Sequence, residues 1–181
     1  KIDESAAAKN MAPKDFVDNL VPAFKEAWKS LNIQYDGFVR TTDESHKKAV
    51  QAVIEKIHAN GDIYLDKYEG LYCSGCEQFY LEKDLKEGNI CPVHGKEVKF
   101  VQEPSYFFKL SKFQDKLLKF YEKNPDFISP AFRRDEILNR VKEGLKDLSV
   151  SRKNLKWGIE FPIDSEHVVY VWFEALCNYI S

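Results

Sequence analysis

The segment Tyr72-Cys73-Ser74-Gly75-Cys76 is followed, after fourteen intervening residues, by Cys91-Pro92-Val93-His94-Gly95. Two thiols separated by two residues, then a thiol and an imidazole separated by two residues, match the ligand spacing of a tetrahedral zinc site. Ligand sulfurs lie about 2.3 Å and ligand nitrogens about 2.0 Å from such an ion, so each short turn brings two ligands to it. The spacing predicts Cys73, Cys76, Cys91 and His94 as the ligands of one metal ion.

Two alternatives for these residues are a disulfide pair and a chance cluster. Only Cys177 remains outside the predicted site, a distribution that suits a reducing compartment better than an oxidising one. Cys177 lies in an apolar stretch, residues 173–180, where we expect a buried, inert thiol. Metal binding is therefore the favoured interpretation. A site with three cysteines and one histidine accepts zinc or iron.

The number of ligands predicts what the metal does. Four protein ligands leave no position for a reactive water, so we expect a structural Zn²⁺ rather than a catalytic one. A hydrolytic zinc enzyme, which needs an open position, is accordingly the weakest alternative. Zinc binding contributes roughly 10–16 kcal/mol in zinc-finger peptides, so removal of the metal is expected to unfold the local loops.

Composition excludes several classes of protein. Of the 181 residues, 44% are hydrophobic, enough for a sizeable core, and the net charge of -2 gives no global attraction to nucleic acid or membranes. No apolar run reaches the roughly 18 residues of a membrane span, and the first residues lack the layout of a signal peptide. We expect a cytoplasmic protein without a membrane partner. The start at Lys1 rather than methionine predicts a piece of a longer protein.

Hydrophobic periodicity predicts helices on both sides of a β-rich middle. Helices are expected over residues 1–10, over 13–31 with a kink or break at Pro22, over 43–60, from Ser111 to Asn124, and from Pro130 onward. Short strands are expected at 63–65, 71–72, 98–101, 106–108 and 148–152, with a hairpin turn at Glu69-Gly70. This order predicts an insertion flanked by two pieces of another domain.

Seven stretches spread over the chain are more specific than its periodicity. They are Arg40-Thr41-Thr42 with His46, then 68–80, 91–95, 105–108, 147–152, 157–159 and 167–175. Together, and in this order, they resemble the middle of a bacterial methionyl-tRNA synthetase.

The resemblance implies an α/β fold of the class I aminoacyl-tRNA synthetases. Residues 1–64 would continue the first half of a split Rossmann catalytic domain, 65–155 would form a small zinc-binding α+β connective-peptide insertion, and 156–181 would start the second half. Lys1 resembles the lysine that follows the family's Asp-x-His-Gly segment. The single pair of metal-binding turns is similar to the one-knuckle subgroup of the family.

The resemblance also implies an activity. The parent enzyme, a methionine-tRNA ligase, uses ATP and Mg²⁺ to activate methionine as an enzyme-bound adenylate and transfers it to the acceptor end of tRNA(Met). The family's His-Ile-Gly-His and Lys-Met-Ser-Lys-Ser signatures, which stabilise the phosphates, do not occur in the sequence. We therefore expect this piece to be inactive alone.

Four residues correspond to the family's methionine pocket. Trp172 resembles the tryptophan beside the methionine side chain, and Ala175, Leu176 and Tyr179 fall where the family lines the rest of the pocket. Contact between a thioether sulfur and an aromatic ring is favourable. The alternative for Trp172 is one more apolar residue in a buried strand-helix junction. Glu174 stands where the family usually has aspartate, and its role stays open.

Charged residues near the end of the chain give a further expectation. Arg152 lies where the family has an arginine facing the mouth of the active site, and with Lys153 and Lys156 it would form a basic patch for the tRNA acceptor end or a phosphate. The alternative is an ordinary solvated loop. For His46 and His167 we expect capping or core roles rather than metal binding or catalysis.

A competing hypothesis is a zinc-ribbon module that binds nucleic acid or protein without catalysis. The nearly neutral charge and the lack of a Lys/Arg-dense face beside the two turns argue against nucleic-acid binding of this kind. Under the synthetase hypothesis, the zinc loops would hold the connective peptide over the entrance of the active site and shape where the acceptor end enters.

Overall fold

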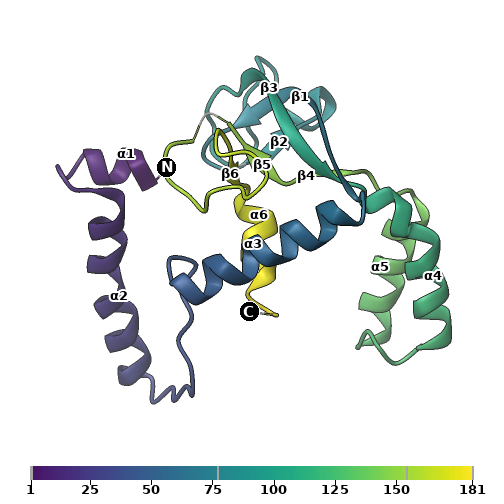
Figure 1. Cartoon of the computed structure of the whole chain (residues 1–181), viewed down its shortest axis with the longest axis horizontal. Coiled ribbons are helices and arrows are strands. Elements are labelled where there is room, and N and C mark those ends of the chain that lie inside the picture. The colour runs from purple at the N-terminus through teal and green to yellow at the C-terminus, as the bar shows by residue number, and fades with distance from the viewer. Residues whose placement is uncertain (1, 77, 154, 181) are drawn as a thin grey trace.

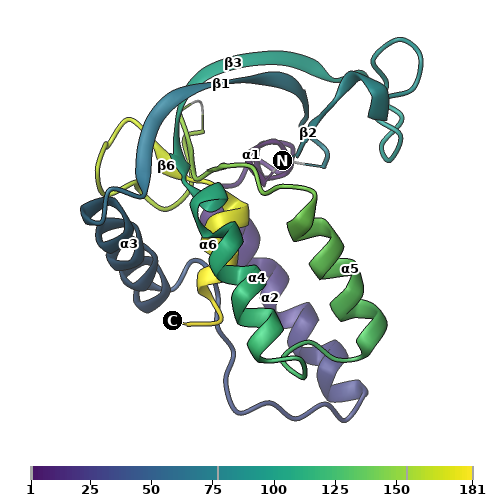
Figure 2. The same ribbon diagram turned by 90° about the vertical axis from the view of Figure 1, so that its right-hand side faces the viewer.

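The computed structural model describes residues 2–76, 78–153 and 155–180, so Lys1 lies outside the described part. Its central feature is a long, curved ribbon of two antiparallel strands (Figure 2). Strand β1 (Ile63–Cys73) pairs with β3 (Lys99–Phe108), from Ile63 opposite Phe108 to Tyr72 opposite Lys99. At about 3.4 Å per residue, this ladder is roughly 30 Å long, measured along the curved strands.

Short strands complete two small sheets. Strand β2 (Gln78–Tyr80) pairs with β1 and β4 (Leu148–Ser149) pairs with β3, which gives the order β2-β1-β3-β4. Strands β5 (Ser151–Arg152) and β6 (Val168–Val169) form a separate pair. All strand pairs in the described part of the chain are antiparallel. The parallel sheet of a Rossmann domain is therefore not among these elements.

The predicted hairpin at Glu69-Gly70 is wrong. Both residues lie inside β1, opposite Gln102 and Val101, and the two strands expected at 98–101 and 106–108 are likewise one strand, β3. A tight hairpin turn needs positive φ at its central residues, which Asn, Asp and Gly adopt readily and Glu does not. The long partner strand β3 instead pairs with β1 from Ile63 to Tyr72, which includes Glu69 and Gly70. The run predicted at 148–152 also differs, because it divides into β4 and β5, which pair with different partners.

The first helices stand apart from the sheet (Figure 1). Helix α1 (Ile2–Ala7) leads into α2 (Pro13–Ser30), which has Pro13 in its first turn as predicted. Pro22 lies inside α2 without ending it, so the predicted division into two helices is wrong. Proline removes one backbone donor, but its fixed φ is compatible with a helix.

The main core forms where α3 (Glu44–Ala59), α6 (Val171–Cys177) and one end of the ribbon meet (Figure 1). As predicted, α3 follows Asp43 and ends before Gly61, whose φ of 72° is left-handed. The buried members of the core are Val50, Ile54, Ile63, Val150, Ile159, Phe161, Val169, Phe173 and Cys177. The predicted burial of Cys177 is confirmed.

A second, smaller cluster lies at the other end of the ribbon. Its buried residues are Cys73, Cys91 and Val98, and Leu71, Tyr80 and Leu85 pack against them. A short 3₁₀ helix, η1 (Glu82–Asp84), lies in the loop between β2 and β3. So few buried side chains provide little hydrophobic stabilisation for these loops.

A helical hairpin follows β3. The 3₁₀ turn η2 (Leu110–Phe113) leads into α4 (Gln114–Lys123), which is connected to α5 (Ala131–Lys142). The helix predicted to start at Ser111 begins later, since α4 starts at Gln114. The Ser111 backbone N–H and hydroxyl instead donate to Asp147 Oδ1 at 3.0 and 2.6 Å, and the Tyr64 hydroxyl donates to the same carboxylate at 2.8 Å. Among the described helices, none has both the length and the apolar character needed to cross a bilayer.

Removal of a core side chain tests this account of the main core. Ile54→Ala is expected to lower the free energy of unfolding by about 2–5 kcal/mol, because Ile54 is fully buried and its loss leaves a cavity. The matched control is Glu55→Ala, an exposed position on the same helix, with an expected change below about 0.5 kcal/mol. Urea denaturation followed by circular dichroism measures both, and equal effects would contradict this core.

Candidate metal centre and an exposed helix face

The two predicted metal-binding turns lie together at the far end of the ribbon. Cys73 is the last residue of β1, Cys76 lies in the turn that follows, and Cys91 and His94 lie in the loop before β3. Their ligand atoms all lie within 4.8 Å of one another. Antiparallel pairing of β1 and β3 brings the turns together, although they are far apart in the sequence.

The distances within this cluster fit one tetrahedral ion. Two sulfurs that each lie about 2.3 Å from one zinc are about 3.8 Å apart. Cys76 Sγ lies 3.6 Å from Cys91 Sγ. His94 Nδ1 lies 3.8 Å from Cys73 Sγ, 3.9 Å from Cys91 Sγ and 3.0 Å from Cys76 Sγ. The imidazole therefore presents Nδ1, rather than Nε2, to the sulfurs.

Two glycines are needed for this geometry. A Cβ on Gly75 would lie 2.8 Å from two ring atoms of His94, too close for any side chain. Gly95 has a φ of 63°, which L-residues rarely adopt, and its N–H donates to the Cys91 carbonyl at 2.9 Å to close the second turn. At Gly75, therefore, glycine is required because the imidazole needs the space, and at Gly95 because of the positive φ.

Hydrogen bonds to the Cys91 sulfur favour its thiolate, the form that binds metals. Burial opposes ionisation of Cys91, but the backbone N–H groups of His94 and Val93 and the His94 side chain lower its pKa to about 5. The Tyr80 hydroxyl lies 3.1 Å from Cys76 Sγ. Hydrogen bonds with Cys76 and Cys91 raise the pKa of Tyr80, so the phenol stays protonated and can donate. In the sequence, Tyr80 belongs to the stretch 68–80 that resembles the family, and its contact with Cys76 was not predicted. The only local signal for this contact is that Tyr80 follows Cys76 by four residues.

The predicted methionine-pocket residues share one face of α6 and the turn after it. Trp172, Ala175, Leu176 and Tyr179 have spacings of three, four and seven residues, which place them on the same side of a helix. Trp172 is 53% and Tyr179 87% exposed, whereas Phe173 and Cys177 on the other side are buried. The alternative that Trp172 is an ordinary core residue is therefore wrong, and an apolar surface is open here.

Arg152 is not part of an exposed basic patch, and that prediction is wrong. Its side chain is 5% exposed, and its guanidinium lies 3.7 Å from the centre of the Tyr170 ring and 3.8 Å from the Glu103 carboxylate. Its Nη1 also donates to Ser149 Oγ at 2.6 Å. These partners offset the cost of burying the charge, and none of them could be recognised from sequence spacing. In contrast, Lys153 and Lys156 are exposed.

The predicted core roles of both histidines are confirmed, since His46 and His167 are buried. His167 Nδ1 lies 3.0 Å from Ser151 Oγ, and its Nε2 lies 3.8 Å from Asp164. Burial lowers the pKa of His167. The contacts from Ser151 to His167 and from His167 to Asp164 resemble those of a hydrolytic triad. However, Ser151 is fully buried and cannot meet a substrate. Its hydroxyl instead accepts the Tyr106 N–H at 2.9 Å.

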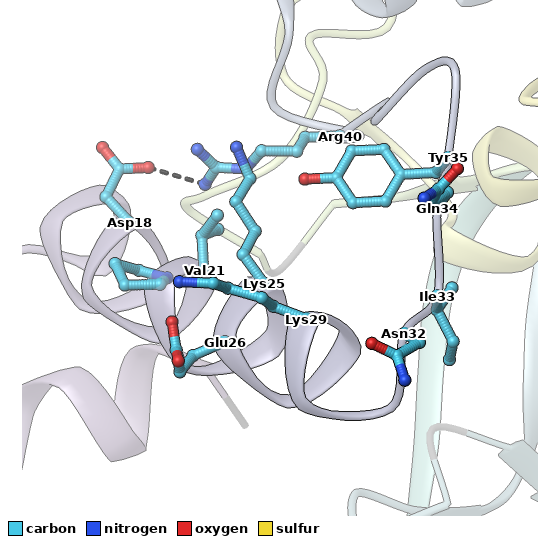
Figure 3. A pocket seen from close by; sticks show the side chains of 11 residues that line it. Asp18, Val21, Lys25, Glu26, Lys29, Asn32, Ile33, Gln34, Tyr35 and Arg40 are labelled. Atoms are coloured by element: carbon cyan, nitrogen blue, oxygen red, sulfur yellow. Dashed lines mark hydrogen bonds and ion pairs between the residues drawn. The ribbon is translucent and has the colours of Figure 1, made fainter.

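A separate groove lies between α2 and the loop that follows it (Figure 3). It has a volume of about 720 Å³ and is lined by Asp18, Val21, Pro22, Lys25, Glu26, Lys29, Asn32, Ile33, Gln34, Tyr35 and Arg40. Arg40 forms an ion pair of 2.6 Å with Asp18 across it. The charges in this lining are mixed, and none of the predicted site residues belongs to it.

Comparisons with known proteins agree with the resemblance. The profile of the family described as "tRNA synthetases class I (M)" matches residues 1–97 and 81–181. Methionine-tRNA ligase from Caldanaerobacter subterraneus is 50% identical over the whole chain, which covers 28% of that protein. The corresponding enzyme from Rickettsia bellii is also 50% identical, with 35% covered.

A solved structure matches as well. Mycobacterium tuberculosis methionyl-tRNA synthetase, in complex with methionyl-adenylate, superposes with a TM-score of 0.90 at 38% identity. The match covers 99% of this chain and 36% of that one. The present chain thus spans about a third or less of the length of these relatives.

Substitution of Gly75 tests the metal site. Gly75→Ala is expected to lower the affinity for Zn²⁺ at least about tenfold, or about 1.4 kcal/mol, because the methyl group displaces the His94 ring. Ser74→Ala, at an exposed position in the same turn, is the control and is expected to bind as the parent does. Competition with a chromophoric chelator measures both affinities. Equal affinities would mean that His94 does not need the space above Gly75.

Proposed function

This chain belongs to the methionyl-tRNA synthetase family of the class I tRNA synthetases, and from that premise we propose that it is the central part of a methionine-tRNA ligase. The full-length enzyme would activate methionine with ATP and Mg²⁺ and transfer it to tRNA(Met). The observation that carries this proposal is the match of fold and sequence, along nearly the whole chain, to a synthetase solved with methionyl-adenylate.

The proposed methionine pocket uses the exposed face of α6. Trp172, Leu176 and Tyr179 form an apolar surface that a soluble protein rarely leaves open, and an apolar ligand side chain would cover part of it. A thioether sulfur gains roughly 0.3–1.5 kcal/mol from an aromatic contact, which suits Trp172 to methionine. Ala175 lies between the larger residues and leaves room for the ligand.

The proposed domain organisation is a split Rossmann domain with an insertion. Residues 1–64 and 156–181 would belong to the two Rossmann halves, and residues 65–155 to the connective peptide. Contacts between α3 and α6 in the main core support this assignment, because these helices come from opposite sides of the insertion. The ribbon β1–β3 would then carry the inserted loops away from the catalytic domain.

The metal of this insertion is proposed to be a structural Zn²⁺. Cys73, Cys76, Cys91 and His94 would fill a tetrahedral shell, and the ion would hold the two turns together without taking part in the reaction. The curved ribbon supports the idea that these loops shape the approach of the tRNA acceptor end to the active site (Figure 2).

The zinc-ribbon module is the less favoured hypothesis. It accounts for the metal-binding loops alone, whereas most buried residues lie at the opposite end of the ribbon and belong to segments matched by the synthetase family. A hydrolytic zinc site is disfavoured by the four clustered protein ligands.

Substitution of Trp172 in the full-length enzyme tests the methionine pocket. Trp172→Ala is expected to raise the KM for methionine severalfold, up to about tenfold, because the sulfur loses its aromatic contact, while the KM for ATP changes little. Methionine-dependent exchange of pyrophosphate into ATP measures both constants. Phe132→Ala on α5, where the ring is 59% exposed, serves as the control. A KM for methionine equal to that of the control would contradict this pocket.

A further inference from the structure

A buried hydrogen bond joins α3 to the helix that carries the proposed pocket. His46 Nε2 lies 3.0 Å from Glu174 Oε2, across 128 positions of sequence. The His46 side chain is fully buried, and that of Glu174 is only 13% exposed. Burial raises the pKa of Glu174, and the hydrogen bond with His46 lowers it. This contact was not predicted, and the role of Glu174 was open.

We propose that His46 and Glu174 are positioning residues for methionine recognition, which they serve by fixing the rotation of α6 about its axis against α3. The proposal rests on the proposed function, since it concerns the same apolar face of α6. Neither side chain would touch the methionine itself.

The placement of Glu174 on α6 supports this role. At 100° per residue, Glu174 lies on the side opposite Trp172, beside the buried residues Phe173 and Cys177. Rotation of α6 that breaks the bond with His46 would also move Trp172 and Leu176, because all project from one short helix. The bond therefore determines the direction in which the apolar face points.

The length of α6 explains why a directional contact is needed. The helix has seven residues, of which only Phe173 and Cys177 are buried. Two buried apolar side chains tolerate small rotations of α6, since the free energy of apolar burial depends weakly on direction. A hydrogen bond, in contrast, weakens steeply when its geometry changes. A bond to a carboxylate in a buried site is also stronger than one between neutral groups.

The other side of the bond is itself held in place. His46 lies in the first turn of α3, a helix that begins directly after Asp43. The Arg40 backbone N–H donates to Asp43 Oδ2 at 2.9 Å, and the Arg40 guanidinium donates to Asp18 Oδ1 at 2.6 Å (Figure 3). The start of α3 is thereby connected to α2, so His46 provides a fixed point for Glu174.

The test uses the full-length synthetase and four variants. His46→Leu and Glu174→Leu each remove one partner of the bond, and H46L/E174L removes both partners together. His46→Gln is the conservative variant, because the glutamine amide nitrogen can take the place of Nε2 and donate to Glu174. The measured quantities are the KM for methionine and for ATP, kcat in pyrophosphate exchange, and the midpoint of thermal unfolding.

The proposal predicts a specific pattern. The KM for methionine should rise about tenfold in both single variants and in H46L/E174L, with no additive loss in the double variant, while the KM for ATP stays within about twofold. His46→Gln should stay within about twofold of the parent for methionine. If a single variant unfolds, H46L/E174L carries the test, because apolar pairs that replace buried polar ones are often tolerated.

Two results would overturn the proposal. One is an unchanged KM for methionine in folded H46L/E174L, and the other is a His46→Gln variant as impaired as His46→Leu. Either result together with an effect of Trp172→Ala would remove the positioning role and leave the pocket intact. An enzyme without methionine-dependent exchange would overturn the proposed function itself, and this inference with it.

Discussion

The antiparallel ladder between β1 and β3 is the constraint on which the rest of the chain depends. One end, at Ile63 and Phe108, contributes to the main core, and the other, at Cys73 and Val98, contributes to the metal-binding cluster. The loops at the far end therefore cannot share the main core. Small units with so few buried side chains are commonly stabilised by metals or disulfides, and the proposed metal ion would have this structural purpose here.

The main core depends on polar contacts as well as on packing. His46 and Glu174 join two helices that lie far apart in the sequence, and a second network holds Arg152 between Glu103 and Ser149. Burial of a polar group costs free energy unless the group has a hydrogen-bond partner. Arrangements of the core that separate such partners are therefore disfavoured. The apolar face of α6 is thus presented by a scaffold with defined orientation, as a binding surface requires.

The sequence predicted features that depend on neighbours a few residues away. The two short turns that hold the clustered cysteines and histidine, the first turn of α2 at Pro13 and the end of α3 at Gly61 are of this kind. Other errors, unlike those at Pro22 and Ser111, concern residues whose partners lie far along the chain. Glu69 and Gly70 extend because of β3, and Arg152 is buried because of Glu103. The groove beside α2 and the contact between His46 and Glu174 had no local signal at all.

In the arrangement proposed here, one metal ion with four protein ligands holds the far end of the ribbon. X-ray absorption at the zinc edge, recorded on the purified full-length protein, tests it most directly. The expected spectrum has three sulfur neighbours at about 2.3 Å and one nitrogen at about 2.0 Å, with no water oxygen. A spectrum with an oxygen ligand or with fewer than three sulfurs, or a folded protein that holds no metal, would contradict a closed structural site.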